Sequence, residues 1–256
     1  MIIRKSPMEV ERLHAAGQLV GRILAALRAQ VRPGMTTMDL ERRALAMIRV
    51  AGAKAAFKGY WVPVIEKRYL HALCTSVNHE VVHGVPSRRR VLREGDIVKV
   101  DCGVLLDGYY GDSATTIPIG TISPAKRRLL RVTRGALDLA VASAVEGRRV
   151  HDMGGMVQRY VERHGFSVVR DFAGHGIGRK LHEDPVVPNW VDPTVPNVRL
   201  RTGMVIAIEP MVAAGAPEIE TLRDGFTAVT ADRSSAAHFE HCVAVTRNGP
   251  RVLTAL

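Results

Sequence analysis

The sequence predicts an α+β fold made of two related halves, each with antiparallel strands and with helices packed on one side of them. Two observations support this prediction. A pair of amphipathic helical segments precedes each group of short β-branched segments, and the order that begins at Ser6-Pro7 begins again at Ser123-Pro124. No linker rich in glycine, serine or charge separates the halves. We therefore expect a single domain over residues 1–256, with pseudo-equivalent halves at about 1–120 and 121–256.

The composition is that of an ordinary globular protein, because 46% of the residues are hydrophobic and 24% are charged. The N-terminus is charged by Arg4 and lacks the apolar core of a signal peptide, and no uncharged apolar run is long enough to span a bilayer. We expect a cytoplasmic protein with no membrane association. The cysteines Cys74, Cys102 and Cys242 form no CxxC pair, so we expect them to be reduced and mostly buried.

The chain is strongly basic, with a formal net charge of +11. Such a charge favours contact with polyanions such as nucleic acid, although neither of the two densest basic clusters contains interleaved aromatic residues for base stacking. The alternative is an ordinary solvated face. The densest basic clusters are Arg88, Arg89, Arg90 and Arg93, and then Lys126, Arg127, Arg128, Arg131 and Arg134.

Helix-start signals open the first half. Residues 6–9 have the form of a capping box with proline at the first helical position, and apolar residues then recur at helical spacing. This pattern predicts a helix over about residues 7–31. A threonine pair at 36–37 offers the N-cap of a second amphipathic helix, which should end near Gly52.

The second half repeats this order. A helix is predicted from Ser123 to near Gly147, and a further helix from about Asp152 to Gly165. Strands follow each helix pair. They are expected around residues 77–85, in a hairpin at 97–119, and at 167–170, 204–209 and 238–246.

The hairpin is predicted because an Asp-Gly pair at residues 107–108 separates two β-branched runs. With a two-residue turn, Asp101 lies opposite Ala114 and Asp112 lies opposite Gly103. Both aspartates then share one face, with small residues beside them that leave room. Two carboxylates on rigid strands suit a hard divalent cation. The alternative is a pair of exposed aspartates on an amphipathic hairpin.

The second half contributes two glutamates: Glu209 ends MVIAIEP, where the following proline keeps it extended, and Glu240 lies in AAHFEHCVAV. A glutamate on an otherwise apolar strand is costly to bury unless a cation or donor meets it, so these acids together with the two aspartates indicate metal. His175 in GHGIG has flanking glycines that let the backbone approach a ligand, and His83 and His182 lie near similar turns. Structural roles are the alternative for these histidines. Three others remain open candidates: His79, His238 and His241.

Taken together, these motifs resemble the type I methionine aminopeptidases over nearly the whole chain. The match runs through SVNHEVVHGVP at 76–86, GDIVKVDCGVLLDGYYGDSATT at 95–116, GHGIGRKLHEDP at 174–185, GMVIAIEPM at 203–211 and FEH at 239–241. The resemblance implies the pita-bread fold of creatinase and aminopeptidases, with two pseudo-symmetric lobes of antiparallel sheet and helices packed outside. It also implies a single catalytic domain that removes the initiator methionine from nascent proteins when the next residue is small.

By motif position, the resemblance implies a dinuclear metal centre. Asp112 and Glu240 would bridge both ions, Asp101 would complete the first, and His175 and Glu209 would complete the second. Two cations ~3.5–4 Å apart can share and activate a water molecule, and Glu209 beside that water would shuttle its proton. The ions would be Co, Mn, Fe or Zn, since an oxygen-rich site with one imidazole accepts each of them.

The resemblance also implies substrate contacts. His83 would contact the amide nitrogen of the scissile bond and His182 its carbonyl, with Cys74 and Phe226 at the substrate pocket. The chain departs from the family pattern in three places. Its segment at 61–73 is longer than usual and borders the methionine pocket, Phe226 stands where many relatives have tryptophan, and His79 stands where many have glutamate. These departures affect the expected shape of the pocket, not the metal site.

Two other functions share some of these features. One is a proline-directed peptidase of the same fold; the other is an inactive pita-bread protein that binds nucleic acid or ribosomes, which the complete set of expected ligands disfavours. For an aminopeptidase of this kind the partners would be nascent polypeptide N-termini, and the basic clusters suggest docking on ribosomal RNA as a hypothesis. We expect a monomer that is a bare catalytic unit without a zinc-finger extension.

Overall fold

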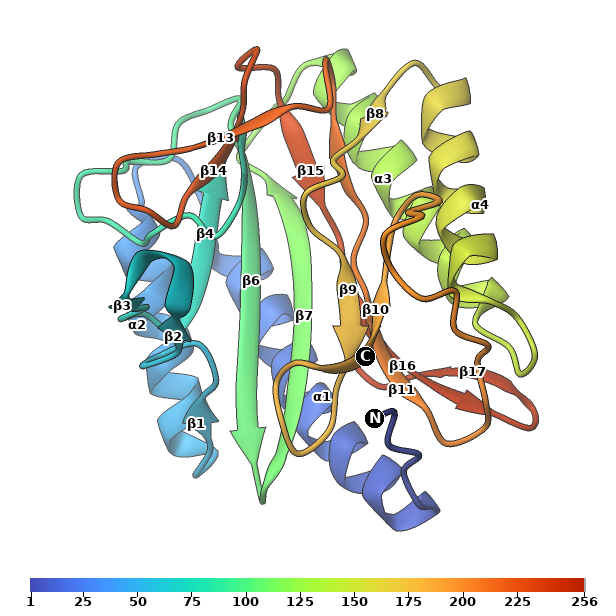
Figure 1. Cartoon of the computed structure of the whole chain (residues 1–256). Coiled ribbons are helices and arrows are strands. Elements are labelled where there is room, and N and C mark those ends of the chain that lie inside the picture. Colours follow the sequence, from blue (N-terminus) through green and yellow to red (C-terminus); the bar gives the residue numbers. More distant parts are fainter. Residues whose placement is uncertain (256) are drawn as a thin grey trace.

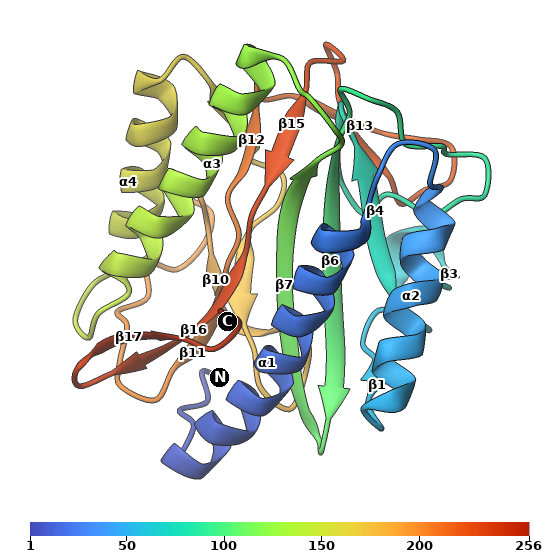
Figure 2. The same cartoon turned by 180° about the vertical axis from the view of Figure 1, so that it is seen from behind.

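Antiparallel sheets occupy the middle of the molecule, and two pairs of helices pack on their outer side (Figures 1 and 2). The computed structural model describes residues 1–255. The helices are α1 (Pro7–Gln30), α2 (Thr37–Val50), α3 (Pro124–Ser143) and α4 (Val150–Arg163). In Figure 2, α1 and α2 lie in front of the first-half strands, whereas α3 and α4 lie over those of the second half. The predicted α+β class is confirmed.

The helices begin at the residue types that predicted them. At α1 the Ser6 hydroxyl accepts from the Glu9 backbone N–H while the Glu9 carboxylate accepts from the Ser6 N–H, and Thr36 and Asp39 form the same reciprocal pair at α2. These caps satisfy backbone donors that a helix leaves unpaired at its start. The predicted bounds agree with the structure to within a few residues, which is the usual uncertainty of helix ends.

The sheet of the first half is built on one long hairpin. Strands β6 (Ile97–Leu106) and β7 (Tyr109–Pro118) pair along their whole length, and β4 (Leu73–Val77) and β1 (Lys54–Ala55) pair with β6 as well. A separate short pair, β2 (Trp61–Val62) and β3 (Lys67–Arg68), encloses a 3₁₀ turn at Pro63–Ile65.

The second half contains two antiparallel sheets and shares a third with the first half. The five-stranded sheet has the order β10 (Glu183–Val187), β9 (Gly174–Gly176), β11 (Val205–Ile208), β16 (His241–Thr246) and β17 (Gly249–Val252). A three-stranded sheet has the order β15 (Ala236–His238), β12 (Met211–Ala213) and β8 (Ser167–Val168). The shared sheet joins β13 (Ile219–Thr221) and β14 (Ala228–Thr230) to β5 (Glu80–Val82) of the first half.

Three predicted strands differ from those observed. The strand expected around 77–85 is shorter than expected and begins later: β4 ends at Val77, a turn follows in which Asn78 has a φ of 55°, and β5 covers only Glu80–Val82. The strand expected at 238–246 is interrupted at residues 239–240, and the one at 167–170 shrinks to two residues. In the first two cases the backbone changes its partner strand within the segment, which no local sequence pattern reports.

Each half has its own hydrophobic core. One core lies between α1, α2 and the strands β4, β6 and β7, and the other lies between α3, α4 and the second-half strands. All three cysteines are free and buried, as expected. Among the described residues, no helix is both long and apolar enough to cross a bilayer.

Candidate metal centre and substrate cavity

The β6–β7 hairpin places two aspartates on one face. Asp101 lies opposite Ala114 and Gly103 lies opposite Asp112, so the pairing is the one expected for a two-residue turn. The turn residues at 107–108 have φ values of 48° and 81°, which suits the turn type that follows the right-handed twist of paired strands. Local turn chemistry therefore sets the spacing of the two carboxylates.

Gly103 serves a different purpose from the one expected. A Cβ added there would lie 2.8 Å from the ring of Phe57 and 2.9 Å from the Cβ of Ala56. The ring of Phe57 thus fills the space beside the aspartates. It can pack against this face of the hairpin because Gly103 has no Cβ.

Glu240 comes from the second half and is held against β7. Its backbone N–H donates to the carbonyl oxygen of Ala114 at 2.9 Å, and its own carbonyl oxygen accepts from the Ser113 hydroxyl at 2.6 Å. These bonds form where the predicted strand is interrupted, between β15 and β16. They bring its carboxylate to the hairpin, and ligand atoms of Asp112, His175 and Glu240 lie within 4.8 Å of one another.

His175 lies in β9, which packs closely between β10 and β11. A Cβ on Gly174 would lie 2.2 Å from the oxygen of Ala207, and one on Gly176 would lie 2.1 Å from the oxygen of Asp184. The glycines therefore allow strands to pack, rather than a ligand to approach the backbone as expected. The Nδ1 atom of His175 lies 2.8 Å from the Gly176 carbonyl oxygen. Because a carbonyl only accepts, Nδ1 carries the proton and Nε2 offers a lone pair to the site.

Glu209 lies between two imidazoles at the end of β11. Its carboxylate oxygens are 3.8 Å from Nε2 of His175 and 3.5 Å from Nε2 of His238. The side-chain amide of Asn189 donates to the carbonyl oxygen of Glu209 at 3.1 Å, which fixes the backbone at this position.

Several buried oxygens of this cluster have no hydrogen-bond donor within residues 1–255: Asp101 Oδ1, Asp112 Oδ1 and Glu240 Oε1. An unpaired buried polar atom costs about 1–3 kcal/mol, and more when it is charged. Divalent cations bind carboxylate oxygens and accept an imidazole nitrogen as well. The unpaired oxygens and the free Nε2 of His175 therefore fit a divalent metal site.

Burial changes the protonation of the cluster. It raises the pKa of Asp101 to about 7 and that of Glu209 to about 8. The pKa values of Asp112 and Glu240 lie well above their usual range, first because of burial and then because of the neighbouring carboxylates. Burial lowers the pKa of His175 to about 4, so its imidazole is neutral at neutral pH. A cation would displace protons from carboxyl groups and not from this histidine.

The cluster lines a cavity of about 390 Å³, whose remaining walls are mainly aromatic and aliphatic. Every residue that the sequence assigned to the site lines this cavity: Cys74, His83, Asp101, Asp112, His175, His182, Glu209, Phe226 and Glu240. The structure therefore brings all of them together from segments far apart in the chain.

His83 and His182 occupy different parts of the cavity wall. The ring of His182 lies 4.4 Å from the ring of His175, in an edge-on arrangement. His83 packs edge-on against Phe172 at 5.1 Å and has a φ of 59°. A positive φ is uncommon for a residue other than glycine, and such strain is concentrated at functional sites.

Sequence reasoning missed Tyr60. Its hydroxyl lies 3.0 Å from Nδ1 of His182, and the two rings meet edge-on at 5.4 Å. The contact joins residues 122 positions apart, so no local pattern indicates it. Val62 and Tyr69 also line the cavity, which places the unusual 61–73 segment at its wall.

Of the three histidines left open, His238 lines the cavity. It is buried, and neither of its ring nitrogens has a hydrogen-bond partner within the described residues. His241 instead contacts the Thr254 hydroxyl at 2.8 Å and Arg134 at 3.2 Å, outside the cavity lining, to which His79 does not belong either.

The chain is similar over most of its length to a known metallopeptidase family and to named enzymes. The model of metallopeptidase family M24 matches residues 11–247. A methionine aminopeptidase of Clostridium acetobutylicum is 46% identical over 254 residues, which is 99% of each chain. A methionine aminopeptidase of Aquifex aeolicus is 46% identical over 252 residues, 98% of each chain.

Solved structures agree with these matches. The crystal structure of a methionine aminopeptidase from Thermotoga maritima has a TM-score of 0.94 and 44% identity, and the match covers 100% of both chains. An Xaa-Pro dipeptidase from Bacillus anthracis has a TM-score of 0.78 at 20% identity, over 98% of this chain and 61% of the dipeptidase. The second likeness concerns the fold alone.

Proposed function

The chain belongs to metallopeptidase family M24, and from this membership and the geometry of the cavity we propose that it is a metal-dependent aminopeptidase that removes N-terminal methionine. Relatives that match nearly its whole length carry that activity in their names. The predicted pita-bread fold is confirmed by its solved neighbours. The observation that carries the proposal is the group of unpaired buried carboxylate oxygens around the free Nε2 of His175.

Five side chains would hold two divalent cations, Co, Mn, Fe or Zn: Asp101, Asp112, His175, Glu209 and Glu240. Such cations supply Lewis-acid activation of a water molecule and of the scissile carbonyl when bound. Because Asp101 and Asp112 come from the first half and the other three from the second, we take residues 1–256 as one catalytic domain.

Glu209 is the proposed proton shuttle. Its carboxylate points into the cavity between His175 and His238, where it can accept a proton from the attacking water and deliver it to the departing amine nitrogen. The Asn189 amide holds its backbone, which limits the movement of the carboxylate during that transfer.

His83 and His182 are the proposed substrate contacts. His83 would meet the amide nitrogen of the scissile bond, and His182 would donate a hydrogen bond to its carbonyl oxygen. The Tyr60 hydroxyl lies 3.0 Å from Nδ1 of His182, and we propose that it donates to this nitrogen. The proton of the ring would then be on Nε2, which is the tautomer that can donate to the substrate.

The rest of the cavity suits a methionine side chain. Its wall includes Phe57, Tyr69, Cys74 and Phe226, and thioethers make favourable contacts with aromatic rings. We propose that the substrate enters with its methionine against this wall and that a small second residue is required beyond it. The substrates would be N-termini of nascent polypeptides, met in the cytoplasm by a monomeric enzyme.

Peptide hydrolysis tests this function. Metal-stripped protein would be resupplied with Mn²⁺, Fe²⁺, Co²⁺ or Zn²⁺ in turn and given Met-Ala-X, Met-Pro-X, Leu-Ala-X and Ala-Pro-X peptides. We expect cleavage of the methionine peptides with at least one ion and little cleavage of Leu-Ala-X. Cleavage of Ala-Pro-X without cleavage of Met-Ala-X would show a proline-directed peptidase instead.

A further inference from the structure

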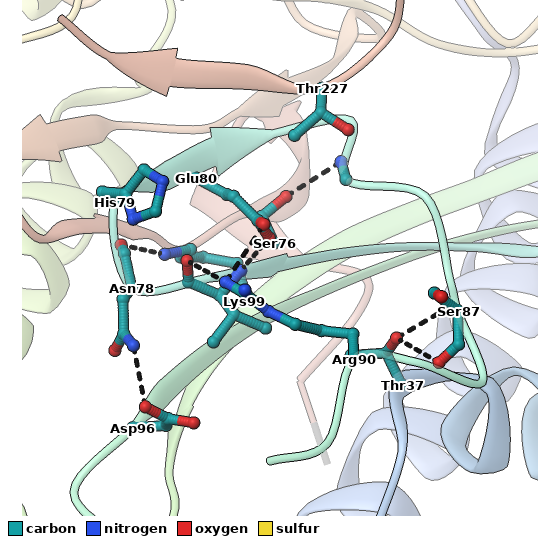
Figure 3. A network of polar contacts seen from close by, with 12 residues as sticks. Thr37, Ser76, Asn78, His79, Glu80, Ser87, Arg90, Asp96, Lys99 and Thr227 are labelled. Carbon is teal, nitrogen blue, oxygen red and sulfur yellow. Dashed lines mark hydrogen bonds and ion pairs between the residues drawn. The ribbon is translucent and has the colours of Figure 1, made fainter. Parts of the chain in front are cut away.

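Lys99 is buried where the two halves meet, on the face of β6 that also carries Asp101. Only 1% of its surface is exposed. Its Nζ atom donates hydrogen bonds to the backbone carbonyl oxygens of Asn78 at 2.6 Å and of Ala236 at 2.9 Å. Figure 3 shows the side chain reaching the turn at Asn78. One amino group thus bridges a turn of the first half and the start of β15 in the second.

Both carbonyl groups belong to segments that lead directly to the cavity. β15 runs from Ala236 to His238 and is followed by Glu240, and β5, which follows Asn78, ends one residue before His83. Lys99 therefore ties the strand that approaches the carboxylate cluster to the strand that approaches a proposed substrate contact.

The turn at Asn78, to which Lys99 donates, is held in place by further hydrogen bonds. The side-chain oxygen of Asn78 accepts from the Ile97 N–H at 3.1 Å and from Nζ of Lys126 at 2.9 Å, and its amide donates to Asp96 at 2.7 Å. The contact with Asp96 is visible in Figure 3. The carbonyl group of Asn78 is therefore a rigid anchor rather than part of a free loop.

A lysine is a costly side chain at this position. Desolvation lowers the pKa of its amino group to about 7, and both acceptors it has within residues 1–255 are neutral carbonyl groups. Methionine would fill a similar volume without that cost. What lysine adds is a pair of directed hydrogen bonds between the halves.

We propose that Lys99 is a positioning residue, which holds His83 and the His238–Glu240 segment in their catalytic arrangement through the carbonyl groups of Asn78 and Ala236. The role rests on the proposed function, because the segments matter only if the cavity is the catalytic site. Lys99 itself is not among the residues that line the cavity.

The test compares Lys99→Met with Lys126→Met. Both substitutions remove an amino group that contacts Asn78. Lys126, however, reaches from α3 to the Asn78 side chain and the Gly95 carbonyl oxygen, and within the described residues it makes no bond to β15. At saturating metal, with metal content checked, we expect Lys99→Met to lower kcat on Met-Ala-X about 10- to 100-fold, since a displacement of about 1 Å costs on that order. KM of Lys99→Met should stay within about threefold of wild type, because the substitution leaves the cavity wall proposed to bind the methionine side chain unchanged. Lys126→Met should keep kcat within about threefold of wild type.

Hydrogen exchange of the metal-loaded proteins gives a second readout. In Lys99→Met, exchange should quicken in residues 78–83 and in residues 236–240, whereas in Lys126→Met it should quicken only around Asn78. If Lys99→Met does not fold, Lys99→Gln replaces it, because a glutamine keeps N–H donors on a shorter neutral side chain. That variant should lose about 3- to 10-fold in kcat with KM nearly unchanged.

Wild-type protein is measured in parallel so that two failures can be told apart. If wild type does not cleave Met-Ala-X with any ion, the proposed function is wrong. If wild type cleaves it and Lys99→Met, or Lys99→Gln in its place, has a kcat within twofold of wild type, the positioning role is wrong. Equal losses and equal exchange patterns in the two methionine variants would also overturn it.

Discussion

At the level of single residues, the carboxylate cluster makes metal binding depend on pH. The pKa values of Asp101 and Glu209, raised to about 7 and about 8 by burial, mean that both groups hold protons in the metal-free protein below those pH values. A cation must displace these protons, so its affinity should fall as the pH is lowered. His175, with its pKa of about 4, does not compete in this range.

We therefore predict that the apparent affinity for Mn²⁺ falls between about pH 8.5 and pH 6, by about tenfold per pH unit for each displaced proton. Titration calorimetry in buffers with different ionisation enthalpies measures both the affinity and the protons released. A constant affinity with no proton release over this range would mean that the carboxyl groups are already ionised in the metal-free protein.

Asp112 has the most demanding role, because its carboxylate is proposed to serve both cations. Asp112→Asn should abolish hydrolysis and remove nearly all bound metal, whereas Asp101→Asn should retain part of it. Metal content by mass spectrometry and peptide hydrolysis check this. Without metal at pH 8, Asp112→Asn should unfold ~2–6 °C higher than wild type. Burial and the neighbouring carboxylates raise the pKa of Asp112 well above its usual range, so this acid costs stability at a pH where it is ionised in the unfolded chain, and an amide does not. Wild-type turnover by this variant would exclude the bridging role.

Tyr60 should matter through its hydroxyl alone. Tyr60→Phe keeps the ring beside His182 and removes the hydrogen bond at 3.0 Å, so we expect kcat to fall about 3- to 10-fold with KM within about twofold. Tyr110→Phe, outside the cavity lining, is the matched control. If the two variants have the same kinetics, the hydroxyl of Tyr60 does not set the tautomer of His182.

At the level of elements, close packing of β9 should be the most sensitive feature of the second half. Gly176→Ala would place a Cβ 2.1 Å from the Asp184 carbonyl oxygen, whereas a Cβ on Gly108 meets nothing within 4 Å. We predict a loss of about 3 kcal/mol or more of unfolding free energy for Gly176→Ala, from overpacking. Gly108→Ala should lose only about 1 kcal/mol, from its positive φ. Urea unfolding measures both, and equal losses would contradict the packing role.

The elements also show what a sequence can and cannot reveal about this fold. Caps at Ser6 and Thr36 and the Asp-Gly turn act within a few residues, so helices and the hairpin register were predictable. The break at residues 239–240 depends on Ser113 and Ala114 of the other half, and the short β9 depends on two neighbouring strands. Such boundaries are decided by tertiary partners.

The residues of the site likewise include some that the sequence could indicate and others that only the tertiary structure reveals. Carboxylates on apolar strands indicated metal from local context, and the resemblance to a family supplied the assignment of ligands. Tyr60 and His238 could not be assigned, because their contacts with His182 and Glu209 join distant segments. An isolated tyrosine or histidine in a sequence gives no sign of such a partner.

At the level of the whole molecule, some basic side chains of the two clusters are bonded within the protein, and others are exposed to solvent. Lys126, Arg127 and Arg128 donate to carbonyl oxygens of the protein itself, and Arg90 pairs with Glu80 at 3.1 Å. Exposed side chains include Arg88, Arg89, Arg93 and Arg131. These four, which do not line the cavity, are the residues that we propose for docking on ribosomal RNA.

Reversing the charge of Arg88, Arg89 and Arg93 should weaken co-sedimentation with ribosomes and leave tripeptide hydrolysis unchanged. The slope of log affinity against log salt should become shallower by roughly 0.7–0.9 for each phosphate that the variant no longer neutralises. Reversal at Arg22, Arg49 and Arg159, which are exposed and lie in α1, α2 and α4, serves as a control with the same change of charge. Unchanged binding and an unchanged salt slope would identify the cluster as a solvated face.

The hydrogen bonds between Glu240 and β7 have a consequence for the life of the protein in a cell. Because the proposed ligands are divided between the halves, bound metal favours only the assembled chain and adds stability that grows with the logarithm of free metal. We expect a cell starved of divalent ions to hold more partly opened molecules, and proteases to remove them first. The amount of this protein would then follow the nutritional supply of metal, even at a constant rate of synthesis.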